Sequence, residues 1–600
     1  MYHYYALDGS INNLLSGLSD ARMDRINRMM RLQRWLGLSY EETDLLLSAC
    51  IRAQGANNTD YSLNAHTLRA LGVFRHWQQK YGISAFQFAA VLDVITPYAI
   101  SPAVSFFDQV FNAPSLFDAP FAVSGETVSY TDVTGDSART VRQICAGLNI
   151  TQAQFRVLAD RVAAEQGDAE AKTLPLTLPV ISALYRLTMV PRWLGLSFAK
   201  GAALLSLAGT GDAAWTALAG VPQLATLSDG QPAGGDILDL LMALDAAAGW
   251  AAAHNLSWVK NYLALQPETD ALVATTATMN FVNGIRQQLP AALIGEQSFA
   301  GVPLPAGSDI SGWLALFPDL IDGSGLVQEA ATGYDTITSM VSADIDAAGI
   351  TFATDADREQ AVNALSGIIN QARLTQNGIA DSALAQMFGT AQSLPPFLLQ
   401  WAGDSEYRLL ADSLAMNEGA ALTDPSQIPA TYLTRLFAVG QRAGISSAFS
   451  LTPATLSLFL AHPDWLGVTD TALSLTLLYR LSRYADWLGV AGDEDRVLGY
   501  LAWVNGATAP DATQAAEALA LLLDWESSEV ADATAALEGG LAKTVAEVDY
   551  VMRLQRLSAE TGLSVTPLLA TGELVPGGVT ETWDAWQSVG ESLVAAQTGQ

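Results

Sequence analysis

The stretch RLQRWLGLSYEETDLLLSA, from Arg31 to Ala49, decides the fold of this chain because the sequence repeats its wording. Related stretches are RWLGLSFAKGAALLSL from Arg192, YADWLGVAGDEDRVLGYL from Tyr484 and RLQRLSAETGLSVTPLLA from Arg553. Each has a run typical of a helix, then a glycine and an apolar residue, and three of the four continue with a serine. A sequence pattern that recurs along a chain predicts a structural unit that recurs with it.

The repeated wording predicts a tight corner between two helices. A glycine such as Gly37 readily takes the left-handed conformation that ends a helix, and the apolar Leu38 then packs back on the last turn. Ser39 is placed to cap the next helix, and Glu42 at its third position completes a capping box.

The same corner is predicted at several other places along the chain. The predicted caps are Gly37, Ser39 and Glu42; Gly82, Ser84 and Gln87; Asn149, Thr151 and Gln154; Gly195 and Ser197; Asn255 and Ser257; Gly444 and Ser446; Gly489; and Gly562 and Ser564. Some corners lie about 45 residues apart, which is the repeat length of HEAT-like arrays. Because other intervals are longer, we predict an irregular, solenoid-like array of helical hairpins.

The hydrophobic periodicity is helical over most of the length. In DRINRMMRLQRWLGL, which starts at Asp24, apolar residues recur at three- and four-residue steps and arginines fill the other face. The best strand-like pattern is FAVSGETVSYTDV at Phe121–Val133, which predicts a small β-hairpin. The predicted fold class is therefore all-α with small β-hairpin decoration.

Loops rich in proline, glycine and small polar residues divide the predicted helices into blocks. We predict helical blocks at 1–111, 139–298, 326–504 and 505–600, with a loop and β-hairpin insertion at 112–138 and a loop at 299–325.

Composition excludes several classes of function. Half of the residues are hydrophobic and 15% are charged, so the chain has enough apolar side chains for large cores. Its formal charge is −31, which repels phosphate backbones, so we expect no nucleic-acid partner and exclude a helix-turn-helix DNA reader. The acidity is typical of a large, leucine-rich body that must stay soluble.

The cysteines and the termini add further expectations. Cys50 and Cys145 make no disulfide framework and fit a bacterial-type cytosolic product stabilised by packing. The N-terminal residues lack the basic and apolar regions of a secretory signal peptide, and no apolar run approaches the length of a membrane span. We expect no membrane span in this chain.

Motifs for catalysis or cofactor binding are absent from the sequence. It has no HExxH, P-loop, GxSxG or dinucleotide fingerprint, and its five histidines are scattered. The stretch Asp344–Asp355 resembles an EF-hand loop, but Ala348 and Asp355 stand where calcium ligands of other types are usual. Thr354 fits a helix cap there instead, so we predict no metal, no cofactor and no catalytic residues.

Fourteen tryptophans leave two alternatives open. An acidic, tryptophan-rich helical chain is typical of an (α/α)-barrel carbohydrate-active enzyme with two catalytic carboxylates, and a helical-repeat adaptor would present a concave surface to a protein partner. However, Trp35, Trp193 and Trp487 stand at matching positions in the repeated wording, which favours a packing role. The predicted packing residues are Trp35, Trp193, Trp487, Phe106, Phe107 and Phe111.

The exact residues of these stretches are more specific than their helical periodicity and capping pattern. RINRMMRLQRWLGLSYEETDLLLSA, LRALGVFRHWQQKYGISAFQFAAVL and FFDQVFN, followed by ISALYRLTMVPRWLGLSFAKGAALLSLAG, LSLTLLYRLSRYADWLGV and VDYVMRLQRLSAETGLSVTPLLATGEL, resemble the A component of bacterial insecticidal Tc toxin complexes in wording and order. The resemblance runs from about residue 18 to about residue 596.

This resemblance implies a function. Tc A components are pentamers in which a helical shell surrounds a translocation channel, bind host-cell receptors or glycans, and receive a B–C cocoon that carries a toxic enzyme. The chain resembles the shell region only, so channel helices would follow it and receptor-binding β-domains are absent or reduced. We expect a secreted toxin part without a signal peptide, either a fragment or one half of a divided A component. The −31 charge adds the expectation that carboxylates between protomers respond to pH.

Overall fold

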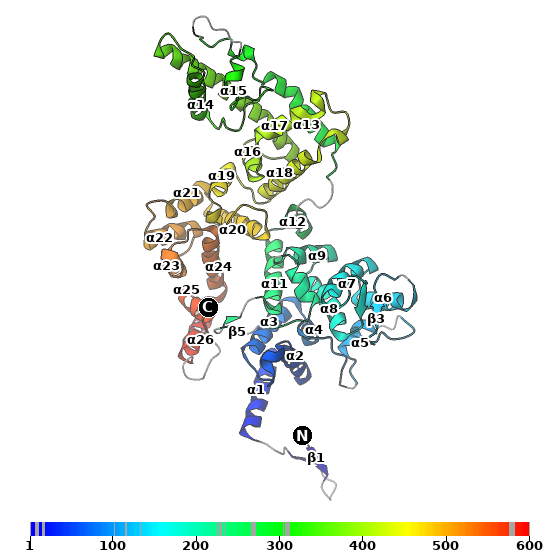
Figure 1. The fold of residues 1–600 in the computed structure, drawn as a ribbon. Coiled ribbons are helices and arrows are strands. Elements are labelled where there is room, and N and C mark those ends of the chain that lie inside the picture. The colour runs from blue at the N-terminus through cyan, green and yellow to red at the C-terminus, as the bar shows by residue number, and fades with distance from the viewer. Residues whose placement is uncertain are drawn as a thin grey trace. The chain divides into compact units, whose positions relative to one another are not determined.

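A computed structural model describes most of the chain. The described residues are 2–5, 11–14, 19–100, 102–113, 117–132, 134–209, 211–224, 227–228, 231–232, 235–265, 272–303, 305, 312–574 and 583–598. They form an all-α fold with small two-stranded sheets (Figure 1).

The chain divides into two compact units. Unit 1 comprises Met1–Tyr262 with Val575–Trp583, and unit 2 comprises Leu263–Leu574 with Asp584–Gln600. The four predicted blocks stay a prediction. Residues 304 and 306–311 of the predicted loop at 299–325 lie outside the described residues.

Unit 1 is a set of short helices joined by tight corners. Its elements are β1 (Tyr2–Tyr5), β2 (Ile11–Leu14), α1 (Asp20–Leu36), α2 (Tyr40–Arg52), α3 (Ala65–Tyr81), α4 (Ala85–Leu92), α5 (Phe106–Phe111), β3 (Thr127–Ser129), α6 (Gly135–Leu148), α7 (Gln152–Gln166), β4 (Thr173–Pro175), α8 (Leu178–Trp193), α9 (Phe198–Leu207), α10 (Ala213–Ala219), β5 (Leu227–Ser228), β6 (Gln231–Pro232) and α11 (Ile237–Ala253). Helix α12 (Trp258–Leu265) crosses the division between the units.

Unit 2 continues the same construction around one long helix. Its elements are α13 (Thr276–Gln288), α14 (Tyr334–Ala347), α15 (Asp355–Phe388), α16 (Pro395–Trp401), α17 (Glu406–Ala415), α18 (Ala430–Ala448), α19 (Pro453–Ala461), α20 (Leu475–Ala491), α21 (Glu494–Val504), α22 (Ala512–Leu523), α23 (Ser527–Thr534), α24 (Val545–Thr561), α25 (Val565–Gly572) and α26 (Trp583–Thr598). Helix α15 has 34 residues and contacts α13, α14, α16, α17 and α18.

The predicted local hairpin at Phe121–Val133 is wrong. Its second half forms β3, which pairs antiparallel with the distant β4, in the register Val128↔Leu174. The first half forms no strand because Phe121 packs against Phe107 and Phe111, with ring centroids 5.7 and 5.3 Å apart. The burial of Phe121 in this core therefore outweighs the local strand pairing that the sequence pattern predicts. Val133 lies outside the described residues.

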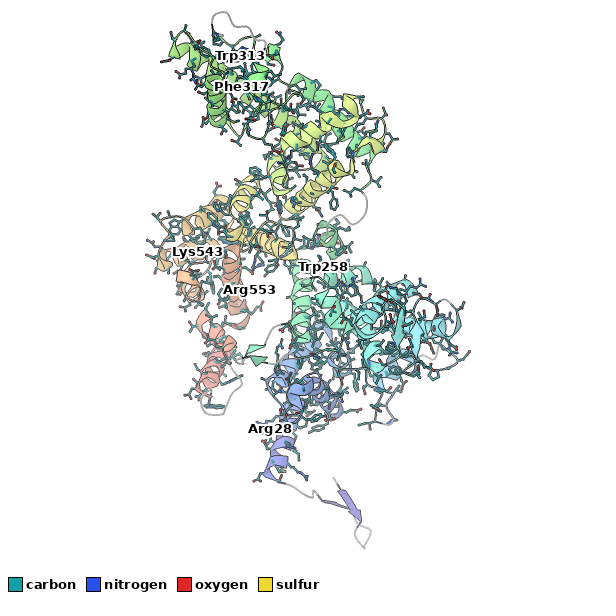
Figure 2. The ribbon with its side chains drawn as sticks, in the orientation of Figure 1. Arg28, Trp258, Trp313, Phe317, Lys543 and Arg553 are labelled. Atoms are coloured by element: carbon teal, nitrogen blue, oxygen red, sulfur yellow. The ribbon has the colours of Figure 1, made fainter. Side chains whose placement is uncertain are left out.

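The segment predicted as a loop at 299–325 contributes core residues where it is described. Trp313 and Phe317 are buried beside α14 and α15, as Figure 2 shows, and the ring of Phe317 lies 6.3 Å from that of Phe299. The backbone reaches this core through the short 3₁₀ turn Leu314–Leu316. These aromatic side chains therefore join a core that is otherwise aliphatic and that α14 and α15 help to form.

Candidate functional site

Several predicted corners have the geometry that the sequence suggests. Gly37 has a φ of 68° and ends α1, and the hydroxyl of Ser39 accepts the Glu42 N–H at 3.2 Å. The Glu42 carboxylate in turn accepts the Ser39 N–H at 2.9 Å. Equivalent capping boxes join Ser84 to Gln87 after Gly82, and Thr151 to Gln154 after Asn149.

Other corners keep the turn without the full cap. Gly195 and Gly562 have φ values of 74° and 73°, and Ser197 and Ser564 stand at the helix starts, where neither hydroxyl makes a capping bond in the described structure. Each corner is thus held by the glycine and by the buried packing around it. Asn255 is also left-handed, and the hydroxyl of Ser257 lies 3.5 Å from the Lys260 nitrogen.

Two predicted corners are wrong. Gly444 and Ser446 lie inside α18, since Ser446 and the neighbouring Ile445 are buried and keep the helix running to Ala448. The turn comes later, where Thr452 caps α19 by accepting the Thr455 N–H at 3.1 Å. Gly489 lies inside α20, which ends at Gly492 because Asp493 stands next to it as a cap for α21.

The three matching tryptophans have different environments. Trp487 is fully buried and meets the ring of Tyr500 edge-on, with centroids 5.9 Å apart. Trp193 is partly buried against Trp77, at 6.4 Å. Trp35 is 50% exposed and lies under the Arg75 guanidinium, so its predicted role as a core packing residue is wrong.

The three phenylalanines predicted as packing residues all lie on α5. Phe107 and Phe111 are buried, with ring centroids 5.1 Å apart. Phe106 is partly buried between Phe86 and Tyr185, at 6.0 and 5.8 Å. These contacts join α5 to α4 and α8.

Buried charges, which the sequence analysis did not find, connect distant helices. Asp549 on α24 is 1% exposed and accepts the Arg483 Nε at 2.5 Å and the Tyr479 hydroxyl at 3.1 Å, both from α20. Arg480 and Arg553 approach the same carboxylate at 3.6 and 3.4 Å, and Figure 2 labels Arg553 on α24. One acidic side chain therefore joins α20 to α24.

Unit 1 contains a similar centre at Asp245 on α11. Its carboxylate accepts His76 at 2.8 Å, Lys80 at 2.7 Å and the hydroxyl of Tyr81, all from α3. Burial opposes ionisation, but the hydrogen bonds from Lys80, Tyr81 and His76 hold the pKa of Asp245 below its usual value. The same contact and burial raise the pKa of Tyr81.

Arg186 is a cation enclosed among backbone carbonyls. Its guanidinium donates to the carbonyls of Leu218, Asp93 and Gly220, at 3.0, 3.2 and 2.5 Å. Burial lowers its pKa to about 9, so the group stays charged at neutral pH. It connects α8 to the chain that leaves α4 and to the end of α10. No local pattern marks such a residue in the sequence.

A polar hollow of about 500 Å³ lies between α15, α16 and the start of α17. Its lining includes the acids Glu329, Asp404 and Glu406 and the bases Arg373 and Arg408, and no tryptophan among the described residues. Within the described part of the chain its one aromatic lining residue is Tyr407, so the tryptophans on which the carbohydrate-active alternative is based do not line this hollow.

Asp381 lies on the face of α15 that continues past this hollow. Its Oδ1 is buried with no hydrogen-bond partner among the described residues. Burial, aided by the negative charge of Glu406, raises the pKa of Asp381 to about 7. This carboxyl group changes charge near neutral pH.

The EF-hand-like stretch has the structure of a helix corner. Asp344 lies within α14, Gly349 has a φ of 67°, and the Thr354 hydroxyl caps α15 by accepting the Asp357 N–H at 3.2 Å. Within the described ranges, no group of three or more histidine, cysteine, aspartate or glutamate side chains is arranged to hold a metal ion. Cys50 and Cys145 are buried thiols, and burial raises their pKa values to about 12 and about 11.

The length and hydropathy of each helix bear on whether it could cross a membrane. In the part of the chain that the structure describes, no single helix is both long and apolar enough to cross a membrane. The bent pairs α11–α12 and α18–α19 reach that length and composition only when each pair is taken together.

Comparisons with known proteins place these features in context. No family model matches the sequence. The toxin subunit YenA1 of Yersinia entomophaga is 30% identical over 606 residues, an alignment that covers 98% of this chain and 50% of the relative. The chain therefore spans about half the length of the curated relative that it matches.

Two solved structures share the fold. TcdA4 of Morganella morganii superposes with a TM-score of 0.55 and 15% identity, over 98% of this chain and 20% of that one. The TcaA–TcaB structure of Yersinia pseudotuberculosis gives a TM-score of 0.54 and 15% identity, over 98% and 25%. The ordered corners, the helical architecture and the toxin-subunit relative agree with the resemblance found in the sequence, and the chain is a Tc toxin A-like component.

Proposed function

We propose that this chain is a structural part of the helical shell of a Tc toxin A component. In this role it encloses and holds the translocation channel and contributes to host-cell attachment and toxin delivery. The observation that carries the proposal is the continuous 30% identity to a toxin subunit over 98% of the chain.

The features of the described residues support a structural role without catalysis. The described polar and aromatic side chains include helix caps, buried tryptophans and buried ion pairs, and each of these stabilises the packing of helices. In the proposal the chain works outside the producing cell as part of a secreted toxin.

The proposed partners are other Tc A chains, in a pentamer, and the Tc B–C subunits. A host-cell surface receptor or glycan is the proposed external partner. The likeness in fold to the TcaA–TcaB structure, whose name pairs two polypeptides, supports assembly with a second, different chain.

The test is assembly with the gene products encoded beside this chain. Each protein is purified alone, mixed, and measured by mass photometry, and the largest species is imaged by electron microscopy. We expect each protein alone to give a smaller species than the mixture, and the mixture to give a large particle with five-fold symmetry. A chain that stays separate from every neighbouring product contradicts the proposal. The control is the same mixture with this chain unfolded beforehand.

A further inference from the structure

Helix α1 carries a positive charge that the rest of the chain does not. It has five arginines, at every third position from Arg22 to Arg34, against two aspartates, while the whole chain has a formal charge of −31. About one sixth of the basic residues of a strongly acidic protein thus stand on one helix of 17 residues.

Most of α1 is exposed. Only its C-terminal end packs on unit 1, where Leu36 is buried and the Arg75 side chain donates to the Trp35 carbonyl at 2.6 Å. The N-terminal half extends away from α2 (Figure 1), and Figure 2 shows Arg28 on this extended part. Residues 20–28 are all exposed.

The extended part also presents apolar side chains. Met23, Ile26 and Met30 share one face of α1 and are 50%, 44% and 38% exposed. With Arg25, Met29 and Tyr40, the residues Ile26 and Met30 line a shallow hollow of about 340 Å³. A helix face that combines exposed methionine and isoleucine with arginines is suited to a partner that offers both apolar and acidic groups.

The chain itself offers such a surface in unit 2. From residue 497 to residue 542 it has no lysine or arginine and seven acids, and Figure 2 marks the next base, Lys543. On α22, Glu517 and Leu521 lie on one exposed face, Leu521 is 73% exposed, and the exposed Asp524 follows as the C-cap of the helix. An apolar side chain flanked by carboxylates on this face is complementary to Ile26 flanked by arginines on α1.

We propose that the exposed part of α1 binds the acidic surface formed by α22 and α23 in a second copy of this chain. Two different, complementary surfaces on one polypeptide are what a head-to-tail interface between identical subunits requires. An anionic membrane is the less favoured occupant, since the net charge of −34 on the rest of the chain opposes approach to it. The inference rests on the self-assembly included in the proposed function.

The test uses charge reversal on each surface. The first variant carries Arg22→Glu, Arg25→Glu and Arg31→Glu on α1, and the second carries Glu517→Lys and Glu526→Lys on the acidic surface. A control variant carries Glu170→Lys and Glu359→Lys, which make the same charge change as the second variant at exposed positions elsewhere. The thermal unfolding of all variants is compared first, because exposed substitutions leave the fold intact.

Light scattering across a concentration series then measures self-association. We expect the wild type and the control variant to self-associate, more weakly at high salt. Each single-surface variant weakens association by about tenfold or more, and mixing the two variants restores association in assemblies that contain both variants. Restoration on mixing shows that the contact lies between copies and not within one chain.

Several results overturn the inference. A wild type that stays monomeric at every concentration excludes a second copy as the occupant. Variants that associate as the wild type does show that self-assembly stands and uses another surface. Binding of the wild type, but not of the α1 variant, to phosphatidylserine vesicles, together with unaltered self-association, assigns α1 to a membrane. Assembly with the neighbouring gene products is measured separately, so the proposed function is judged on its own result.

Discussion

The Nε of Arg483 and the Oδ1 of Asp549 lie 2.5 Å apart, although 66 residues separate them along the chain. The carboxylate is 1% exposed and the arginine side chain 16% exposed. The burial of a carboxylate is costly unless cations and hydrogen-bond donors surround it, and α20 supplies both.

Removal of this carboxylate destabilises unit 2. Asp549→Ala leaves Arg483 partly buried without its main partner, and we expect a loss of about 3 kcal/mol in the free energy of unfolding. The control is Asp486→Ala, which removes the more exposed partner of the same arginine and costs about 1 kcal/mol or less. Urea unfolding measures both, and equal losses would show that Asp549 contributes no more than a surface ion pair.

The helix caps provide a second matched pair. Ser39→Ala removes the hydroxyl that accepts the Glu42 N–H and leaves the bond from the backbone N–H of residue 39 to the Glu42 carboxylate, and we expect a cost of about 1 kcal/mol. Ser197 stands at an equivalent helix start with no capping bond, so Ser197→Ala has an effect near zero. Thermal unfolding of the two variants distinguishes them. A larger effect at Ser197 would mean that hydroxyl bonds do not hold these corners.

Gly325 is the position where a side chain is least tolerated. Its φ is +91°, and a Cβ there would lie 2.3 Å from the Ile294 carbonyl oxygen. Gly325→Ala therefore costs about 3 kcal/mol or more, from backbone strain and steric overlap together. At Gly37, φ is also positive but no atom lies within 4 Å, so Gly37→Ala costs about 1–2 kcal/mol. Urea unfolding compares them, and a smaller loss at Gly325 would contradict the predicted overlap.

Asp381 makes stability depend on pH. Because its pKa is about 7 in the fold and near 3.8 when unfolded, the folded state holds the extra proton between these values. Its contribution to stability is fully present below about pH 4 and decreases as pH rises through 7.

Asp381→Asn tests this dependence. We expect the variant to be more stable than the wild type at pH 8 by about 1–2 kcal/mol, a value reduced for partial solvent screening, and nearly equal to it at pH 4. Glu406→Gln, which removes the neighbouring negative charge, shifts the wild-type transition to lower pH. Parallel pH profiles for the wild type and the Asn variant would show that Asp381 does not titrate in this range.

The sequence predicts those features whose causes lie within a few residues. Gly37, Ser39 and Glu42 form a corner because all three contacts are local. Gly444 carries the same wording, but the burial of Ile445 and Ser446 extends the helix, and only the packed structure determines that burial. The β3–β4 pairing and the contact between Arg483 and Asp549 join segments far apart in sequence, so no local pattern indicates them.

Helix α15 sets the tolerance of unit 2 to changes in length. At 34 residues it is about 50 Å long, and five other helices contact its surface. One inserted residue would rotate everything beyond it by about 100° and shift it by about 1.5 Å, which puts each downstream contact out of phase. Insertions are therefore expected in the connecting segments. The helical phase along α15 fixes the positions at which α16, α17 and α18 pack against it.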